Sequence, residues 1–254
     1  MNKVVLLGSG NMAWHLCKAF TEIENVTIIQ HYHHRSQEEN FQQFGVDFTN
    51  DLKKLKKADF YILAVADDAI APLSAELPVL EGIVLHTSGT VGMNDLDAKH
   101  RKGVFYPLQT LTKGVAVDFL KIPICCEAAN SSDLKLIMEL ANSISTVVVE
   151  MSSEKRLALH LAAVFANNFV NHLYNCAYDI CKSHQVETHL LEALIKETAK
   201  KVVESSPEAS QTGPAKRGDK KTINTHLNML EEDYKTIYKT ISESLLDHYG
   251  REKL

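Results

Sequence analysis

The stretch from residue 3 to residue 13 constrains the fold more than any other part of the sequence. An apolar run ends at Gly8 and Gly10, and a helix-like run follows at once. A buried strand, a tight turn and a helix N-terminus in this order form a site for dinucleotide phosphates. The first glycine permits the turn, the second lets a pyrophosphate approach the backbone, and Ala13 packs the helix on the strand. The predicted cofactor contacts here are Gly8, Ser9, Gly10, Asn11 and Met12; the alternative is a glycine turn without a ligand.

Composition excludes several classes of protein. The chain has 254 residues, 45% of them hydrophobic and 23% charged, which is typical of a soluble globular protein. A net charge of −5 gives no basic field for nucleic acid. Five cysteines without a C-x-x-C pair favour free thiols in a reducing compartment. The first strand begins directly at the N-terminus, and no apolar run is long enough to span a membrane. We therefore expect a cytoplasmic protein without nucleic-acid or membrane partners.

Strand-like and helix-like runs alternate through the first 150 residues. The predicted strands are residues 3–7, 26–31, 60–65, 83–86, 103–106, 122–126 and 146–151. The predicted helices are residues 11–21, 36–44, 68–77 and 131–144. Several strands are continuous runs of Val, Ile and Leu, as in strands buried on both faces. This alternation predicts an α/β Rossmann domain, with a doubly wound, mostly parallel sheet.

No strand signal remains after Met151. Serines 152 and 153 suit a helix start, and no Gly or Pro interrupts the chain from there to about residue 183, which predicts one long helix. Further helices are expected at residues 187–203 and 220–249, the last in one piece or two, with a Pro- and Gly-containing loop between them. We predict a nucleotide-binding domain over residues 1–151 and an all-helical domain for substrate and dimerisation over residues 152–254.

The end of the second strand indicates which dinucleotide binds. An acidic residue there would bind the ribose 2′-hydroxyl of NAD, but the segment from Gln30 to Ser36 contains none. Arg35 suits a 2′-phosphate instead, and Ser36 offers it a hydroxyl hydrogen bond. The sequence therefore predicts NADP, although Ser36 also suits the N-cap of the next helix, a role compatible with the first.

Other strand ends supply further candidate cofactor contacts. Val65, Ala66 and Asp67 follow a central strand and are expected beside the cofactor crevice. Asp67 is suited to a cofactor contact, to the N-cap of the next helix, or to both. His86 ends the next strand and is expected near the nicotinamide. Histidines 31, 33 and 34 lack a Cys or carboxylate at ligand spacing, so no metal site is predicted, and contact with the adenosine end is the alternative.

Candidate substrate contacts come from both halves of the chain. Ser88 follows the strand that ends at His86, and Gln109 and Thr110 follow another strand. On a wheel with 3.6 residues per turn, His160 shares an uncharged polar face with Asn167 and Asn171, and Asn168 lies at its edge. Such a face suits a partly buried cleft or a subunit contact. In the loop of residues 212–219, Lys216 and Arg217 suit an anionic substrate group, and Asp219 suits either Arg217 or a helix cap.

These motifs together carry a family resemblance over nearly the full length. The glycine motif, Arg35–Ser36, residues 64–70 and the helical second half resemble the β-hydroxyacid dehydrogenase and pyrroline-5-carboxylate reductase superfamily. A narrower set of motifs is similar to a bacterial family of oxidoreductases that pairs a Rossmann-like domain with a C-terminal domain of unknown function. These motifs are residues 86–89, 106–109, 167–169, 212–214 and 217–219. The resemblance implies a 6-phosphogluconate dehydrogenase-like helical domain, a homodimer and an active site between domains.

One departure from the superfamily bears on the chemistry. Its hydroxyacid dehydrogenases place a catalytic lysine four residues before an asparagine, where this chain has Val164 before Asn168 and Asn167 before Asn171. His160 is the remaining acid–base candidate, because histidine titrates near neutrality. The sequence thus predicts hydride transfer between NADP(H) and a small carbonyl or imine substrate, with His160 moving the proton and Ser88 and Asn168 orienting the substrate. The alternatives are a non-catalytic NADP sensor and a deazaflavin (F420)-linked NADP reductase.

Overall fold

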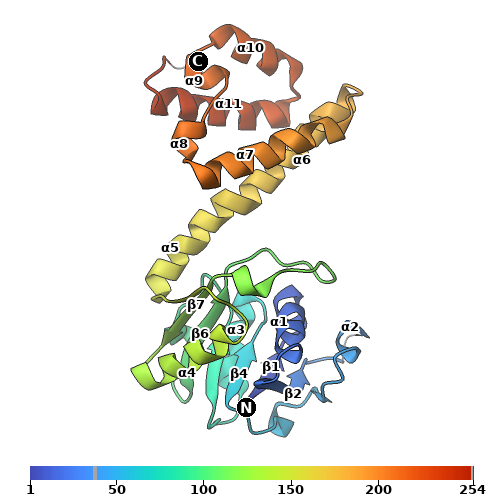
Figure 1. The fold of residues 1–254 in the computed structure, drawn as a ribbon, viewed down its shortest axis with the longest axis vertical. Coiled ribbons are helices and arrows are strands. Elements are labelled where there is room, and N and C mark those ends of the chain that lie inside the picture. The colour runs from blue at the N-terminus through green and yellow to red at the C-terminus, as the bar shows by residue number, and fades with distance from the viewer. Residues whose placement is uncertain (37–38, 253) are drawn as a thin grey trace. The chain divides into compact units, whose positions relative to one another are not determined.

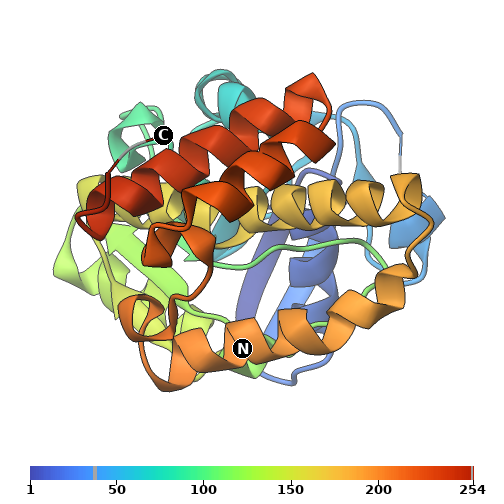
Figure 2. The same cartoon turned by 90° about the horizontal axis from the view of Figure 1, so that it is seen from above.

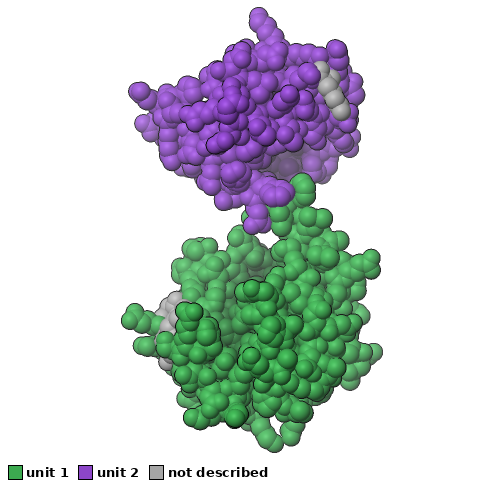
Figure 3. Space-filling model, turned by 180° about the vertical axis from the view of Figure 1, so that it is seen from behind, with its two compact units in different colours: residues 1–167 green, residues 168–254 purple. Residues whose placement is uncertain are grey.

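The computed structural model describes residues 1–36, 39–252 and 254. The chain forms two compact units, residues 1–167 and residues 168–254, coloured green and purple in Figure 3. The first unit contains the whole sheet, and the second is helical (Figure 1). The helix of residues Ser153–Ala163 therefore belongs to the same unit as the sheet, although the strand pattern in the sequence ends at residue 151.

The first unit is built on one eight-stranded sheet. Its strands are β1 (Asn2–Leu7), β2 (Val26–Tyr32), β3 (Phe48–Thr49), β4 (Phe60–Leu63), β5 (Ile83–His86), β6 (Arg101–Pro107), β7 (Ile124–Ala128) and β8 (Val148–Glu150). The strand order is β3-β2-β1-β4-β5-β6-β7-β8. The chain reverses its winding direction between β1 and β4, and ligands of open α/β sheets bind at such a point. The predicted doubly wound Rossmann sheet is confirmed.

Pairing is parallel throughout except at one place. β6 and β7 pair antiparallel, with Phe105 opposite Cys126, and β7 and β8 are again parallel to each other. The expectation of a mostly parallel sheet holds, with this reversal beyond the sixth strand. Only the first six strands in the order therefore present their carboxyl ends at the edge where the glycine turn lies.

Helices cover both faces of the sheet. The helices and 3-10 turns of this unit are α1 (Asn11–Thr21), α2 (Glu39–Gln42), η1 (Leu52–Lys54), α3 (Asp67–Glu76), η2 (Met93–Asp95), η3 (Phe119–Lys121), α4 (Ser131–Asn142) and α5 (Ser153–Ala163). Alternate strand residues point to opposite faces. Val4 and Leu6 pack with α1, α2 and α4 in one core cluster, whereas Val5 and Leu7 pack with α3 in another.

The predicted long helix contains a π-helical segment. Residues Val164–Phe169 form a π-helix between α5 and α6 (Val170–Ser183). The chain is thus helical from Ser153 to Ser183, as predicted, with a change in winding that no glycine or proline marks. A wheel with 3.6 residues per turn does not apply across these residues. The common face of His160, Asn167 and Asn171, which was derived from such a wheel, therefore stays a prediction.

The second unit is assembled from short and medium helices. They are α6, η5 (Thr188–Leu191), α7 (Glu192–Glu204), α8 (Pro207–Ser210), α9 (Pro214–Arg217), α10 (Lys220–Met229) and α11 (Glu232–His248). α10 and α11 lie side by side in both views (Figure 1, Figure 2). Ala215, Ile223 and Leu246 form the buried cluster that joins α9, α10 and α11. The last helical region is thus in two pieces, as expected.

Candidate active site

The glycine turn is shaped by contact with a neighbouring strand. Gly8 has φ +116°, and a Cβ there would lie 2.2 Å from the carbonyl oxygen of Ala64, just after β4. A side chain at this position is excluded both by the backbone angle and by the space. Gly8 N–H donates to Tyr32 O at 2.9 Å, and His31 Nε2 lies 2.7 Å from Gly8 O. The turn is therefore fixed to β2 and to the end of β4.

Gly10 differs from Gly8. It is the N-cap of α1 at φ −70°, and no side chain caps the helix. A Cβ on Gly10 would meet no atom within 4 Å. The N–H groups of the first turn lack intrahelical acceptors and face this open space. Nothing in the protein requires glycine here, whereas a phosphate approaching the N-terminus of the helix does.

A cavity lies on the α3 side of the turn. Its volume is about 240 Å³, and it is lined by Gly8, Tyr32, His33, His34, Val65, Ala69, Pro72, Leu73 and Glu76. The structure thus brings Val65, His33 and His34 to one space beside the turn, and their contact with the adenosine end stays a prediction. Arg35 and Ser36 follow directly and are exposed. α2 is described from Glu39 onward, so the role of Ser36 as an N-cap falls partly outside the described residues.

The segment after β5 is buried and internally hydrogen-bonded. The backbone N–H of Ser88 donates to His86 Nδ1 at 3.2 Å, and Ser88 Oγ accepts the N–H groups of Thr90 and Val91 at 3.0 Å each. Thr90 Oγ1 in turn donates to Asp67 Oδ2. Burial lowers the pKa of His86 to about 4, and the nearby Arg156 charge adds to this effect. His86 is therefore neutral at physiological pH, and Ser88 holds the loop that follows it.

His160 lies against this loop. Its Nδ1 is 3.1 Å from the phenolic oxygen of Tyr106, at the end of β6. A Cβ on Gly89 would come within 2.5 Å of the same nitrogen, so the imidazole sits directly on the glycine. Burial raises the pKa of Tyr106, which keeps its phenol protonated. The predicted acid–base residue and the predicted loop are thereby next to each other.

An anchor that the sequence analysis did not identify positions His160. Arg156, one turn earlier on α5, is fully buried, and its Nη1 donates to Glu127 Oε2 on β7 at 2.6 Å. Its Nη2 donates to Val91 O and, at 3.1 Å, to Ser153 Oγ. The face of α5 with Arg156 and His160 thus contacts the sheet and the loop. The four-residue spacing of Arg156 and His160 indicates that both lie on one face of the helix. No sequence pattern indicates Glu127 as the partner of Arg156, because Glu127 is remote in sequence.

The other predicted substrate contacts lie in the segment after β6 and in the second unit. Gln109 and Thr110 are exposed in the segment after β6, and the Thr110 N–H donates to Gln109 Oε1 at 2.9 Å. Asn168 and Asn171 are exposed in the second unit. Lys216 Nζ donates to Gln211 O at 2.8 Å and lies over the Tyr249 ring, and Arg217 is exposed. Asp219 caps α10 through the Thr222 N–H, one of its two expected roles.

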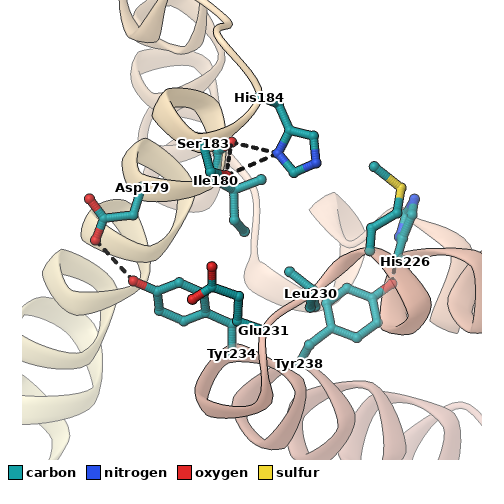
Figure 4. A pocket seen from close by; sticks show the side chains of 10 residues that line it. Asp179, Ile180, Ser183, His184, His226, Leu230, Glu231, Tyr234 and Tyr238 are labelled. Atoms are coloured by element: carbon teal, nitrogen blue, oxygen red, sulfur yellow. Dashed lines mark hydrogen bonds between the residues drawn. The ribbon is translucent and has the colours of Figure 1, made fainter.

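The second unit has cavities of its own between α6 and α11. One, of about 450 Å³, has Asp179 and His184 on one wall and Tyr234 and Tyr238 on the other (Figure 4). Tyr234 donates to Asp179 at 3.0 Å, and His226 Nδ1 lies 2.7 Å from the Tyr238 hydroxyl. A second cavity, of about 300 Å³, is mostly apolar and is lined by α6, α11 and residues 212–215. Among the described residues no group of three or more His, Cys, Asp or Glu is arranged to hold a metal ion.

The strand order, the turn at Gly8 and the open N-terminus of α1 define a dinucleotide-binding α/β protein. Family comparisons agree with this class. The model described as "NADP oxidoreductase coenzyme F420-dependent" matches residues 3–85, and "Domain of unknown function (DUF2520)" matches residues 122–245. A search of curated proteins finds no match.

Solved structures extend the comparison to the whole chain. A "putative NADP oxidoreductase" from Bacteroides fragilis is 36% identical, with a TM-score of 0.89 over 97% of this chain and 98% of the other. An imine reductase from Myxococcus stipitatus with NADP+ has 12% identity and a TM-score of 0.65 over 98% and 93%. Pyrroline carboxylate reductase from Plasmodium falciparum with NADP has 11% identity and a TM-score of 0.61 over 98% and 97%. The last two show the fold alone.

The chain belongs to the oxidoreductase family of the Bacteroides fragilis protein, in which a Rossmann-like nucleotide-binding domain precedes a DUF2520 domain. The resemblance that the sequence motifs carry is thereby confirmed. Within the described residues, no helix is both long and apolar enough to cross a membrane.

Proposed function

We propose that the protein is an NADP-dependent oxidoreductase that interconverts a small carbonyl or imine compound and its reduced form. The observation that carries the proposal is the contact of His160 with Tyr106 and Gly89, at the edge of the sheet where the glycine turn also lies. NADPH supplies the hydride when it is bound. Gly8, Gly10 and the N-terminus of α1 hold its pyrophosphate, and Arg35 and Ser36 bind its 2′-phosphate.

The hydrogen bond to Tyr106 sets the proton position on His160. When the phenol donates to Nδ1, the neutral imidazole carries its proton on Nε2. With NADPH bound as the hydride source, Nε2 would be the proton donor for the carbonyl oxygen or imine nitrogen of the substrate. The reverse reaction returns the proton to Nε2. Ser88 contributes through the loop that it holds together, and Asn168 and Asn171 orient the substrate, with Gln109, Thr110, Lys216 and Arg217 as further contacts.

NADPH oxidation at 340 nm, with a panel of cyclic imines and small ketones, tests the reaction. For a substrate that turns over, His160→Ala should lower turnover by about 10²- to 10⁴-fold while NADP+ affinity is unchanged. His184→Ala is the matched control, because His184 is exposed and hydrogen-bonds within its own helix region. Full activity of His160→Ala would refute the role of His160. NADPH binding without turnover of any compound would favour an NADP sensor.

One observation favours a second candidate function. The family model that matches residues 3–85 is described as coenzyme F420-dependent. A deazaflavin-linked enzyme would pass the hydride between F420 and NADP, so mixing reduced F420 with NADP+ and following absorbance at 340 nm tests it directly. Absence of NADPH formation rules this candidate out.

We further propose that the helical part of the chain forms a homodimer. Among the described residues of 168–254, the buried apolar side chains are Cys176, Ala215, Ile223 and Leu246. Many larger ones are exposed: Leu173, Val186, Leu190, Leu194, Val202, Val203, Met229 and Ile241. A core this small supports a unit of this size poorly, and burial against a second copy would complete it. Sedimentation velocity at micromolar concentration should give about twice the mass of one chain, and a single-chain mass would contradict the dimer.

The proposed location is the cytoplasm. The five cysteines are free thiols, and four of them are buried. Reducing compartments maintain such thiols. A fusion to a fluorescent protein in the host cell tests this, with a peripheral or exported signal as the contrary result.

A further inference from the structure

The two cavities of the second unit adjoin each other. The larger, of about 450 Å³, is lined from α6, α10 and α11 (Figure 4), and the smaller, of about 300 Å³, is mostly apolar. Both are lined by Ile180, Leu230, Tyr234 and Tyr238. Each volume lies within the range of small-molecule sites, which is about 300–1,000 Å³. All of the lining residues belong to one compact unit, residues 168–254, and none of them has a part in the proposed reaction.

The charged groups of the larger cavity favour a cation. Its ten lining residues include the carboxylates of Asp179 and Glu231, and no lysine or arginine is among the described residues that line it. Asp179 accepts the Tyr234 hydroxyl at 3.0 Å and pairs with Lys182 at 3.6 Å. Glu231 has no ion pair with any residue that the structure describes. One carboxylate at this cavity therefore lacks a positive partner.

Hydrogen bonds hold the two tyrosines of the cavity wall in place. Tyr234 donates to Asp179, and this bond raises its pKa, to which the charge of Glu231 adds. The hydroxyl of Tyr238 lies 2.7 Å from His226 Nδ1, and their rings meet edge to face with centroids 5.6 Å apart. Both phenols are thus engaged at their oxygen atoms, while their rings line both cavities. Since an aromatic ring attracts a nearby cation, these rings suit an ammonium group beside Glu231.

We propose that the two cavities bind a cationic amine with an apolar body. Its ammonium group pairs with Glu231 and Asp179 and contacts the ring of Tyr234. Its hydrocarbon part extends past Ile180 and Leu230 into the smaller cavity, where apolar surface is removed from water. An uncharged ligand would leave Glu231 without a partner, and both carboxylates would repel an anion. The inference depends on neither the NADP cofactor nor the proposed reaction.

Calorimetric titration of the full-length protein with phenylbutylamine tests the inference, with phenylbutanol and phenylbutyrate as its uncharged and anionic counterparts. The amine should bind, more weakly as salt is added, and the other two should bind at least about tenfold more weakly. Glu231→Gln should weaken amine binding by about three- to tenfold, because it removes one exposed ion pair. Glu204→Gln is the matched control, because Glu204 is an exposed carboxylate of α7 that pairs with Lys200 and lines neither cavity.

A second substitution tests the apolar part of the site. Ala177→Leu, on the wall of the smaller cavity, fills part of its volume. It should weaken phenylbutylamine binding at least about fivefold and leave the shorter benzylamine within about twofold of its wild-type affinity.

Three results would overturn the inference. One is equal affinity of the wild-type protein for phenylbutylamine and phenylbutanol. Another is unchanged phenylbutylamine affinity in Glu231→Gln or Ala177→Leu, or an equal loss in Glu204→Gln. The third is no amine binding by the wild-type protein, as expected if a second copy of the chain fills these cavities.

Discussion

Gly8 and Gly10 lie two residues apart in one motif, but glycine occupies the two positions for different physical reasons. Gly8 has a positive φ and no room for a Cβ beside Ala64 O. Gly10 has an ordinary φ of −70°, and as an N-cap it takes a place where Ser or Asp would serve the helix well. The fold requires the first glycine, whereas no contact of the fold requires the second.

This difference predicts opposite outcomes for two alanine substitutions. Gly8→Ala should destabilise the protein by about 3 kcal/mol or more, because it combines backbone strain with a clash. Gly10→Ala should change stability by no more than about 1 kcal/mol but weaken NADP+ binding at least about tenfold. Urea unfolding followed by the fluorescence of Trp14, the one tryptophan, measures stability in the sheet-containing unit. Equal destabilisation by both substitutions would contradict this assignment.

The buried histidine after β5 predicts a pH dependence of stability. Since folding lowers the pKa of His86 from 6.5 to about 4, the unfolded chain binds a proton between these values and the folded chain does not. Stability is therefore complete above pH 6.5 and falls as the pH decreases toward 4, by up to about 3 kcal/mol from this residue.

His86→Asn isolates that contribution. The amide oxygen of asparagine can accept the Ser88 N–H in place of Nδ1, but it does not titrate. In urea unfolding at pH 7 and pH 4.5, the wild-type protein should lose more stability on acidification than His86→Asn does. A parallel loss in both proteins would show that other groups dominate.

At the scale of elements, short-range patterns predicted most of the first unit. α1 and β5 begin and end where the sequence placed them, because each is bounded by glycine or by a clear change of period. The two-residue β3, the π-helix at 164–169 and the short α8 and α9 were not predicted. The short elements depend on tertiary contacts. The π-helix is a change of winding for which residues 164–169 carry no local sequence signal.

The anchor of α5 is the clearest case of a contact outside the reach of local patterns. Arg156→Met would leave the largely buried Glu127 carboxylate without its partner, at an expected cost of about 3–5 kcal/mol. The double substitution Arg156→Met, Glu127→Met should recover much of this stability, since an apolar pair replaces the buried ions. Urea unfolding of the wild-type protein, of both single variants, Arg156→Met and Glu127→Met, and of the double variant gives the coupling energy. A single variant within about 0.5 kcal/mol of wild type would show that the pair does not hold the helix.

At the scale of the whole molecule, the sequence defines a candidate cofactor site more readily than a candidate catalytic site. The glycine motif is local, so Gly8 to Met12 can be proposed as cofactor contacts from consecutive residues. His160, Tyr106 and Gly89 come from three distant elements, and only the fold brings them together. His160 was found from its helix, but its partner Tyr106 was not singled out. Asn168, Asn171, Lys216 and Arg217 remain predictions, because they lie in the other unit.

The small core of the second unit gives a prediction for the intact protein. If a second copy completes this core, dissociation is coupled to unfolding, and the melting temperature depends on protein concentration. Calorimetric scans over a hundredfold range of concentration should show the transition move upward by several degrees. Ile241→Glu, on an exposed apolar position of α11, should lower the transition and abolish the concentration dependence. A transition independent of concentration in the wild type would contradict the dimer.

The two glycines also bear on how such proteins diverge. A descendant that lost its cofactor would still need Gly8, since the strand crossing beside it persists with the fold. Position 10 would be released from selection and would drift toward the residues that helices prefer at their start. Among distant relatives, a retained first glycine beside a substituted second one would thus mark lineages in which the scaffold has outlived its nucleotide.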